Sequence, residues 1–478
     1  MFKTLTIGSV AALLLMIGEN TTKTPPKTQL VTTNTPLETA AKNYKNLCSS
    51  CHGEKVEMFV DRQWKHGKTK AELIKSITGG YPDNGMPSWG AVLKPKEVAD
   101  MADYILTGLE KASKYSFASK PKSNIFSSSE LTVKLDTIAS GLKSPWGMAF
   151  LPGGDLIVTD KIGDIYRVGK NQQKTKVTGG PSVLAEGQGG LLDVELHPKF
   201  AENGLIYFSY SAFKTEGGDK LSTTAVMRAK LDGTTLRDQK IIFEAQPYLK
   251  TRHHYGSRME FDRSGHLYVT VGDRGQHVPL LPQKTDNDCG KVHRLNDDGS
   301  IPTDNPFVKT ADAHGSVFSY GHRNLQGLAM NPSTGEIWEH EHGPRGGDEL
   351  NIIKKGSNYG WPVISYGINY DGTVLTPLTA REGMEQPLTY WIPSIAPSGM
   401  VFVTGDKYAP WKGDLLVGSL RFKYLNRCKI QNGKVVKEEI LLENLGRMRN
   451  VQMGNDGYIY VGVEDPGYVF RLVPLPVK

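Results

Sequence analysis

The sequence contains one short motif, Cys48-Ser49-Ser50-Cys51-His52, whose residue types and spacing point directly to chemistry. In a C-x-x-C-H motif the two thiols add to the vinyl groups of a haem, and the imidazole that follows ligates the iron. A disulfide between Cys48 and Cys51 would leave the histidine without a role. The motif therefore predicts a covalent haem c attached through Cys48 and Cys51, with His52 as an iron ligand.

A sixth iron ligand is expected from a methionine or histidine farther along the chain. Met86 lies in a loop of sequence GMPSW, framed by glycine and proline, 34 residues after His52. A thioether ligand raises the reduction potential of a haem, which suits an acceptor of electrons. We therefore predict Met86 as the sixth ligand, with His66 as its competitor.

Three helical patterns accompany the haem motif. They are TPLETAAKNYKNL before Cys48, KTKAELIKSI at 68–77 and KPKEVADMADYILTGLEK at 94–111. In the third pattern, Val98, Met101, Tyr104 and Ile105 fall on one face, as in a helix that packs on a core. We predict a compact α-helical domain over residues 37–112. Together with the C-x-x-C-H motif and the GMPSW loop, it resembles a small class I cytochrome c.

The N-terminal residues precede this domain as an export signal would. An apolar run from Leu5 to Ile17 follows a short basic start and is followed by a polar segment rich in Thr, Pro and Lys. We predict a signal peptide over residues 1–18, a tether over 19–36 and a periplasmic or otherwise exported protein. A run of thirteen residues is too short to span a bilayer comfortably. Because no small-x-small cleavage site is obvious, an uncleaved anchor is the first alternative and a buried N-terminal helix the second.

A different pattern begins after a Ser- and Lys-rich linker predicted at 113–130. Apolar alternation, a Pro/Asp/Asn-x-Gly turn and a short Val/Ile/Leu/Tyr strand follow one another six times, at 148–158, 192–208, 259–270, 328–338, 400–417 and 451–460. Over 348 residues, six repeats average about 58 residues each. Repeats of this kind indicate four-stranded blades. We predict an all-β six-bladed β-propeller over residues 131–478, behind a small N-terminal all-α cytochrome c domain.

The composition agrees with a β-rich chain and gives no sign of a nucleic-acid partner. Of the 478 residues, 52 are Gly and 27 are Pro, which is more turn-forming material than a helical protein contains. The 57 basic residues nearly balance the 50 acidic ones, and like charges do not form long runs. A nucleic-acid-binding protein would show a basic cluster.

Polar clusters interrupt the strands of the predicted propeller. The segment HHYG at 253–256 comes just before a strand, where the imidazole of His254 can act as a general base. The guanidinium groups of Arg323, Arg447 and Arg449 occupy equivalent blade entrances, which suits a planar ligand with several carboxylates. The loop at 341–349 offers carbonyl and carboxylate oxygens to a hard cation such as calcium.

From about residue 134 to the end, the chain resembles the soluble quinoprotein glucose dehydrogenase and aldose sugar dehydrogenase family, also described as glucose/sorbosone dehydrogenases. The matching phrases lie in nearly every repeat: PWGMAFLP at 145–152, GQGGLLD at 187–193, HHYGSR at 253–258, GHRN at 321–324, GP and DE within 343–349, NYGWP at 358–362 and GRMR at 446–449. The resemblance implies a six-bladed propeller that binds pyrroloquinoline quinone (PQQ) and calcium at its channel mouth. It also implies oxidation of aldoses at the anomeric carbon to lactones.

The resemblance further implies roles for individual residues. His254 would take the hydroxyl proton while hydride passes to the quinone. Main-chain carbonyls of Gly343 and Pro344 would ligate calcium. The expected PQQ contacts are Gln188, Arg323, Asn324, Arg447 and Arg449. Where the glucose enzyme places a lysine against PQQ, Arg421 is the positional match and Lys423 a nearby rival; the second, structural calcium loop of that enzyme is poorly matched at 365–369.

Together these expectations describe a periplasmic quinohaemoprotein, a PQQ-dependent aldose sugar dehydrogenase that passes electrons to its own haem c. Its expected partners are an aldose and a downstream respiratory electron acceptor. The protein would contact the membrane only if the N-terminal segment remained as an uncleaved anchor. One alternative keeps the scaffold but oxidises sorbosone or another alcohol or aldehyde. The other is a non-catalytic ligand-binding propeller joined to an electron-shuttling cytochrome. Cys289 and Cys428 are expected either to pair or to remain two buried thiols.

Overall fold

A computed structural model describes residues 35–48, 56, 59, 64, 66–81, 86–113, 123–275, 280–370, 373–464 and 466–475, with the backbone only at 111–113. The predicted signal peptide, nearly all of the tether, Cys51 and His52 lie outside these residues. In the part of the chain that the structure describes, no helix is both long and apolar enough to cross a membrane.

Among the described residues, the N-terminal unit contains three helices: α1 (Pro36–Leu47), α3 (Lys70–Gly79) and α4 (Pro95–Ser113). Thr35 and Glu38 form a capping box at the start of α1, and Thr69 and Glu72 form another at the start of α3, so the first backbone N–H groups of both helices are satisfied. Both helices pack against α4. Their apolar faces meet in one core that includes Met101. The three predicted helices are confirmed.

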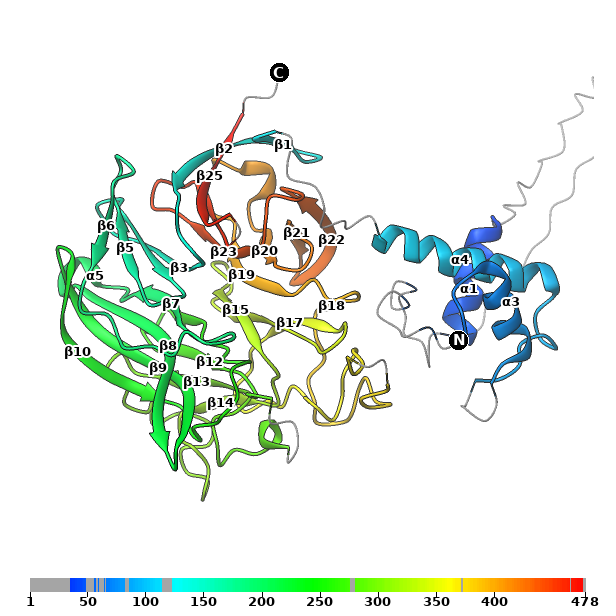
Figure 1. The fold of residues 1–478 in the computed structure, drawn as a ribbon, viewed down its shortest axis with the longest axis horizontal. Coiled ribbons are helices and arrows are strands. Elements are labelled where there is room, and N and C mark those ends of the chain that lie inside the picture. The colour runs from blue at the N-terminus through cyan, green and yellow to red at the C-terminus, as the bar shows by residue number, and fades with distance from the viewer. Residues whose placement is uncertain are drawn as a thin grey trace, which may run out of the picture.

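The rest of the chain forms six antiparallel sheets around a central axis (Figure 1). Five of these sheets each contain four strands that are consecutive in the sequence. The first sheet contains β3 (Pro145–Phe150), β4 (Leu156–Asp160), β5 (Ile165–Val168) and β6 (Lys174–Val177), and the second contains β7 (Leu191–Leu196), β8 (Leu205–Glu216), β9 (Asp219–Asp232) and β10 (Thr235–Glu244). The third contains β11 (Met259–Phe261), β12 (Leu267–Val271), β13 (Lys291–Leu295) and β14 (Val317–Tyr320), the fourth β15 (Leu325–Met330), β16 (Ile337–Glu341), β17 (Asp348–Ile352) and β18 (Thr389–Trp391), and the fifth β19 (Pro397–Phe402), β20 (Leu415–Ser419), β21 (Leu425–Gln431) and β22 (Lys434–Leu441). The sixth contains β23 (Met448–Met453), β24 (Ile459–Val463), β25 (Tyr468–Pro474), β2 (Thr132–Ala139) and β1 (Ile125–Ser127). Short helices α5 (Phe200–Asn203), η3 (Leu281–Gln283) and η4 (Ala409–Trp411) lie in connections.

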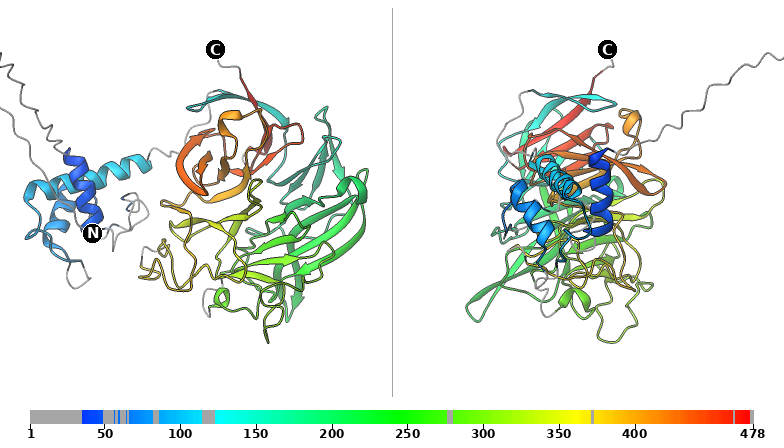
Figure 2. Two further views of the ribbon diagram at one scale, coloured as in Figure 1. Left: turned by 180° about the vertical axis from the view of Figure 1, so that it is seen from behind. Right: turned by 90° about the vertical axis from the view of Figure 1, so that its right-hand side faces the viewer.

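The first strand of each sheet lies nearest the axis. Strands β3, β7, β11, β15, β19 and β23 contact one another in a closed ring. Most residues of these inner strands are buried and the rest are half-buried, as expected when each blade packs its faces against two neighbours. The six predicted repeats coincide with the six inner hairpins, so the six-bladed propeller is confirmed (Figures 1 and 2).

The ring is closed by strands from the two ends of the propeller sequence. Strand β2 pairs antiparallel with β25, with Val133 opposite Pro474. Strand β1 extends this sheet, although it lies inside the segment expected to be linker. Its Phe126 packs against the buried cluster of the sixth sheet, and a three-residue edge strand within a Ser-rich segment carries no periodicity that would reveal it.

Two cysteines of the propeller are buried free thiols. Cys289 precedes β13 in the third sheet, and Cys428 lies on β21 in the fifth. Burial raises the pKa of Cys289 to about 12. Of the two expectations for this pair, the structure therefore shows separate buried thiols.

Candidate functional site

The propeller contains a cavity of about 360 Å³ at one end of its inner hairpins. In an antiparallel hairpin the start of the first strand and the end of the second lie together. Residues just before β7, β11 and β15 and just after β12 and β16 therefore meet at one end of the ring. The long β17–β18 connection completes the wall, and the lining residues are Gln188, His253, His254, Asp273, Gly275, Arg323, Pro344, Trp361, Asn369, Tyr370 and Leu375.

The predicted base, His254, is held by a buried carboxylate. Its Nδ1 lies 2.7 Å from Oδ1 of Asp273, and only 1% of the Asp273 side chain is exposed. His254 has a φ of 54°, in the left-handed region that non-glycine residues rarely adopt, and such backbone strain gathers at functional sites. The hydrogen bond to Asp273 favours the tautomer with a proton on Nδ1, which leaves Nε2 free to accept one.

The electrostatics of this pair keep the imidazole neutral. Burial, reinforced by the charge of Arg323, lowers the pKa of His254 from its ordinary value to about 4. Burial alone would raise the pKa of Asp273, but the hydrogen bond and charge of His254 and the charge of Arg323 leave it lowered. At neutral pH the pair is therefore an ionised carboxylate beside a neutral imidazole, which is the state a general base requires.

Three further contacts fix the geometry of the pair. Trp361 Nε1 donates to the second oxygen of Asp273 at 2.8 Å, and the Gly275 N–H donates to the first at 2.7 Å. The backbone N–H of His254 donates to Oε1 of Gln188 at 2.7 Å. Gln188, expected as a cofactor contact, therefore also anchors the strained backbone that carries the imidazole.

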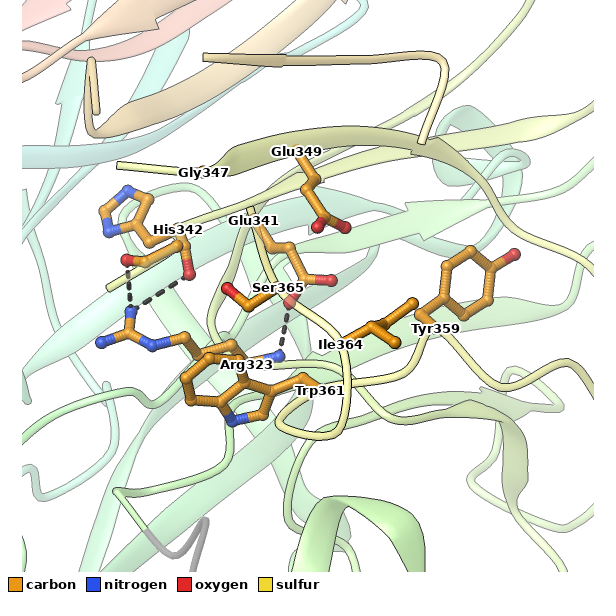
Figure 3. Close-up of a pocket in the computed structure, with 10 residues that line it drawn as sticks. Arg323, Glu341, His342, Gly347, Glu349, Tyr359, Trp361, Ile364 and Ser365 are labelled. Carbon is orange, nitrogen blue, oxygen red and sulfur yellow. Dashed lines mark hydrogen bonds between the residues drawn. The ribbon is translucent and has the colours of Figure 1, made fainter. Parts of the chain in front are cut away.

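Arg323 also lines the large cavity. Its guanidinium lies 5.1 Å from the centre of the Trp361 ring. Its Nη1 donates to the carbonyls of His342 at 3.0 Å and Gly343 at 2.7 Å, as Figure 3 shows. Nε of Arg323 is buried without a hydrogen-bond partner among the described atoms. A buried guanidinium with spare donor capacity suits an anionic ligand.

Arg447 and Arg449 share one carboxylate. Glu464 accepts from Arg447 Nε at 2.8 Å and from Arg449 Nε at 2.6 Å. Burial would raise the pKa of Glu464, but the two guanidinium groups lower it to about 2. Two cations balanced by one ionised carboxylate leave a net positive site, as a polyanionic ligand requires.

The other expected cofactor contacts differ in their positions. Asn324 is buried, and its Oδ1 accepts from the Gly256 N–H at 3.3 Å, directly beside the His254 loop. Arg421 donates through Nη1 to the Ser394 carbonyl at 3.0 Å and lies over the Phe422 ring, and it is not among the described residues that line the cavity. The cofactor contacts, including Arg421, stay predictions.

A small cavity of about 10 Å³, large enough for one water or ion, is lined by Gly343, one of the two expected calcium ligands. Figure 3 shows Glu341 and Glu349 in its wall. The Gly343 carbonyl already accepts from Arg323 but has a second lone pair, whereas Pro344 lines the larger cavity.

Behind this cavity lies a buried cluster of acidic side chains. Ligand atoms of His322, Glu339 and Glu341 lie within 4.8 Å of one another. Asn351 donates to Glu339 at 2.8 Å, while the second oxygen of Glu339 has no hydrogen-bond partner among the described atoms. Burial and the neighbouring Glu341 carboxylate raise the pKa of both Glu339 and Glu349. Carboxylates and carbonyls at this spacing fit a hard, oxygen-preferring cation such as calcium.

The described part of the haem motif agrees with a cofactor against the helical core. The backbone N–H of Cys48 donates to Tyr44 at the end of α1, and the Cys48 side chain packs against the core. Met86 exchanges two backbone hydrogen bonds with Tyr81, at 2.8 and 3.1 Å, and the Tyr81 ring stacks on His66. Both candidate sixth ligands thus lie beside Tyr81. Met86 stays a prediction, as do Cys51 and His52 outside the described residues.

Sequence reasoning missed Asp273, Trp361 and Glu464. Asp273 lies two residues after the end of β12, and counting along the β11–β12 hairpin places it beside His254. Trp361 belongs to the NYGWP phrase, but its contact with Asp273 spans 88 residues. Glu464 follows β24 at the end of the hairpin that begins with Arg447 and Met448, so the same count would have found it.

Comparisons with known proteins agree with this geometry. The family described as glucose/sorbosone dehydrogenase matches residues 142–471, and the family described as cytochrome c oxidase, cbb3-type, subunit III matches residues 35–105. The aldose sugar dehydrogenase YliI of Escherichia coli strain K12 is 40% identical over 352 residues, which cover 72% of this chain and 93% of that protein.

Solved structures match the propeller closely. The apo-form of the soluble aldose sugar dehydrogenase from Escherichia coli has a TM-score of 0.69 and 38% identity, covering 72% of this chain and all of that one. The PQQ-bound form of the aldose sugar dehydrogenase from Streptomyces coelicolor has a TM-score of 0.59 and 30% identity, covering 72% of this chain and 98% of that one. The chain therefore belongs to the glucose/sorbosone dehydrogenase family, with a cytochrome c domain ahead of its six-bladed propeller.

Proposed function

We propose that the propeller oxidises an aldose at its anomeric carbon to the lactone with PQQ, and that the attached haem c carries the electrons onward. The observation that carries this proposal is the His254–Asp273 pair. In it a neutral imidazole is oriented by a buried carboxylate and lines the same cavity as Arg323. A ligand-binding propeller without activity has no use for a base held in this way.

The residues around the cavity fit PQQ. A volume of about 360 Å³ lies within the range of small-molecule sites. Arg323 Nε, which has no hydrogen-bond partner among the described atoms, offers a donor to a carboxylate. Arg447 and Arg449 do not line the cavity, and their half-buried guanidinium groups would add positive charge to the site. When bound, PQQ would supply the acceptor for the hydride that leaves the anomeric carbon. Gln188 and Asn324 would orient it from the β7 and β15 sides.

The chain's own residues would handle the proton. Nε2 of His254 would accept the proton of the anomeric hydroxyl, because Nδ1 is engaged with Asp273. Asp273 would remain ionised and stabilise the imidazolium while it exists. In sum, one aldose gives one lactone, two electrons and two protons. The cation that Gly343, Pro344 and the nearby carboxylates would hold is calcium, which would polarise a bound carbonyl oxygen.

The place of the reaction and its final partner are part of the proposal. The N-terminal apolar segment would direct the chain to the periplasm, and the haem would pass electrons to a respiratory acceptor. Dye-linked assays test the enzyme itself: the protein is loaded with PQQ and calcium, given an aldose, and followed by reduction of a soluble dye. Dye reduction that depends on PQQ and on sugar is expected. Protein with bound PQQ that reduces no dye with any aldose would overturn the proposal.

Replacing Arg449 by alanine is expected to weaken PQQ binding. Hydrogen bonds to charged groups contribute about 1.5–3 kcal/mol, which corresponds to a roughly ten- to hundredfold rise in the PQQ Kd. Fluorescence titration of the apoprotein measures this. Arg167→Ala, which removes a guanidinium bound to Asp155 on the first sheet, is the matched control. Arg447→Ala removes the more exposed partner of Glu464. It tests the same arginine pair if Arg449→Ala fails to fold. An unchanged Kd in both variants would remove this arginine pair from the cofactor site.

A further inference from the structure

Two of the three most exposed large hydrophobic side chains in the described part of the chain lie in one connection of the propeller, and the third lies in the helical unit. Tyr370 is 70% exposed, Val374 65% and Val92 63%. Tyr370 and Val374, together with Leu378 at 42%, belong to the β17–β18 connection. Val92 belongs to the helical unit and follows the expected haem ligand Met86 by six residues. Exposed apolar groups that gather in this way mark interaction surfaces.

Tyr370, Val374 and Leu378 form what we call the rim patch, at the edge of the large cavity. Their neighbours Asn369 and Leu375 line that cavity with Tyr370. The segment is held in place: Ser365 donates to the Leu378 carbonyl at 3.0 Å, and Asn369 donates to Thr373 at 3.0 Å through its backbone N–H. The exposure of the rim patch is therefore a property of an anchored loop that borders the proposed site of sugar oxidation.

Val92 lies on a matching surface of the helical unit, which we call the methionine face. Pro87, Ala91 and Val92 are exposed there, next to the half-buried Met86. Trp89 donates to Ile77 of α3 at 3.1 Å, and Val92 donates to Trp89 at 3.0 Å, so this segment is also anchored. The face presents apolar surface beside Met86, the expected iron ligand.

Electron transfer slows steeply as the distance between two cofactors grows, so the haem must approach the mouth of the cavity. The two units are joined by residues 114–122 between their described parts, and nine residues span at most about 30 Å. Such a short connection keeps the effective concentration of one unit near the other high, so even a small apolar contact can be populated.

We propose that the rim patch is the docking surface for the methionine face of the chain's own cytochrome unit. The inference rests on the proposed function, because it assumes that electrons leave the cavity for the haem. Each docking event reduces one ferric haem to ferrous. One aldose supplies two electrons, so the haem is reduced twice, and a one-electron acceptor such as ferricyanide or a second cytochrome reoxidises it between the two events.

Charged substitutions in the rim patch test the proposal in the full-length protein. Val374→Asp and Leu378→Asp are expected to slow reduction of the haem by sugar about tenfold or more, since docking would bury a charge without a partner. Reduction of a small dye should stay unchanged, because neither side chain lines the cavity. Ile241→Asp, at a 54% exposed position on β10, is the matched control and should change neither rate.

A charge pair across the interface gives the sharper result. Val92→Lys alone should also slow haem reduction, and Val92→Lys combined with Val374→Asp should recover part of the lost rate. Haem reduction at the wild-type rate in all three rim and face variants would overturn the docking surface. A dye rate that falls together with the haem rate would overturn it too, because the loop would then serve catalysis. Wild-type protein that reduces dye but not haem would instead contradict the proposed electron path.

Discussion

In the His254→Ala variant, turnover of an aldose is expected to fall about a hundredfold or more while PQQ remains bound. General-base catalysis contributes about 10²–10⁴-fold, and His254 is the group whose free Nε2 faces the cavity. The contact between its backbone N–H and Gln188 does not need the imidazole, so the loop should keep its form. Steady-state dye reduction at saturating PQQ measures the loss, and a PQQ titration confirms binding.

The neighbouring imidazole provides the control for this variant. His253 lines the same cavity, and its ring lies 4.7 Å from that of His254, but it is not paired with Asp273. His253→Ala should therefore cost much less turnover than His254→Ala. Equal turnover in wild type and His254→Ala, with PQQ shown to be bound, would mean that His254 is not the base.

Asp273→Asn is expected to lower kcat by about a hundredfold or more, as in other sites where a carboxylate orients a histidine base. Asp273 accepts from His254 and Gly275 through one oxygen and from Trp361 through the other. An asparagine must turn its NH₂ group toward one of these donors, so it disturbs the tautomer of His254 or the Trp361 contact. It also removes the negative charge that stabilises the imidazolium.

A second histidine–aspartate pair in the same sheet is the matched control. Asp262 lies 3.1 Å from Nδ1 of His266 in the turn that joins β11 to β12, at the opposite end of the hairpin from Asp273. Asp262→Asn should leave kcat near the wild-type value. The kcat of both variants is measured with a soluble dye, together with thermal unfolding. A wild-type kcat in Asp273→Asn would show that His254 needs no orienting carboxylate.

The sequence predicted the architecture because its repeats are local. Each inner hairpin pairs short apolar strands across a Gly-containing turn, and the turn residues recur with the blades. His254 was also predictable, since an imidazole just before an inner strand must face the end of the channel. The three helices followed from apolar periodicity, and the capping boxes found in the structure, such as that of Thr35, agree with where they begin.

Contacts between distant segments could not be predicted in this way. The interaction of Trp361 with Asp273 depends on how the β17–β18 connection folds back over the third sheet. The direction of Arg421 depends on the Ser394 loop, which offers its guanidinium a carbonyl close by. The state of Cys289 and Cys428 depends on which blades carry them. In each case the deciding partner is set by tertiary packing and leaves no periodic signal.

The most direct test of the account is optical. The full-length protein is loaded with PQQ and calcium, its haem is oxidised, and a panel of aldoses is added without oxygen while the reduced-haem absorption bands are followed. Haem reduction that requires both PQQ and a sugar is the expected result. Protein that holds PQQ, reduces a dye with sugar and leaves its haem oxidised would contradict the internal electron path. Protein that holds PQQ and reduces neither would contradict the dehydrogenase itself.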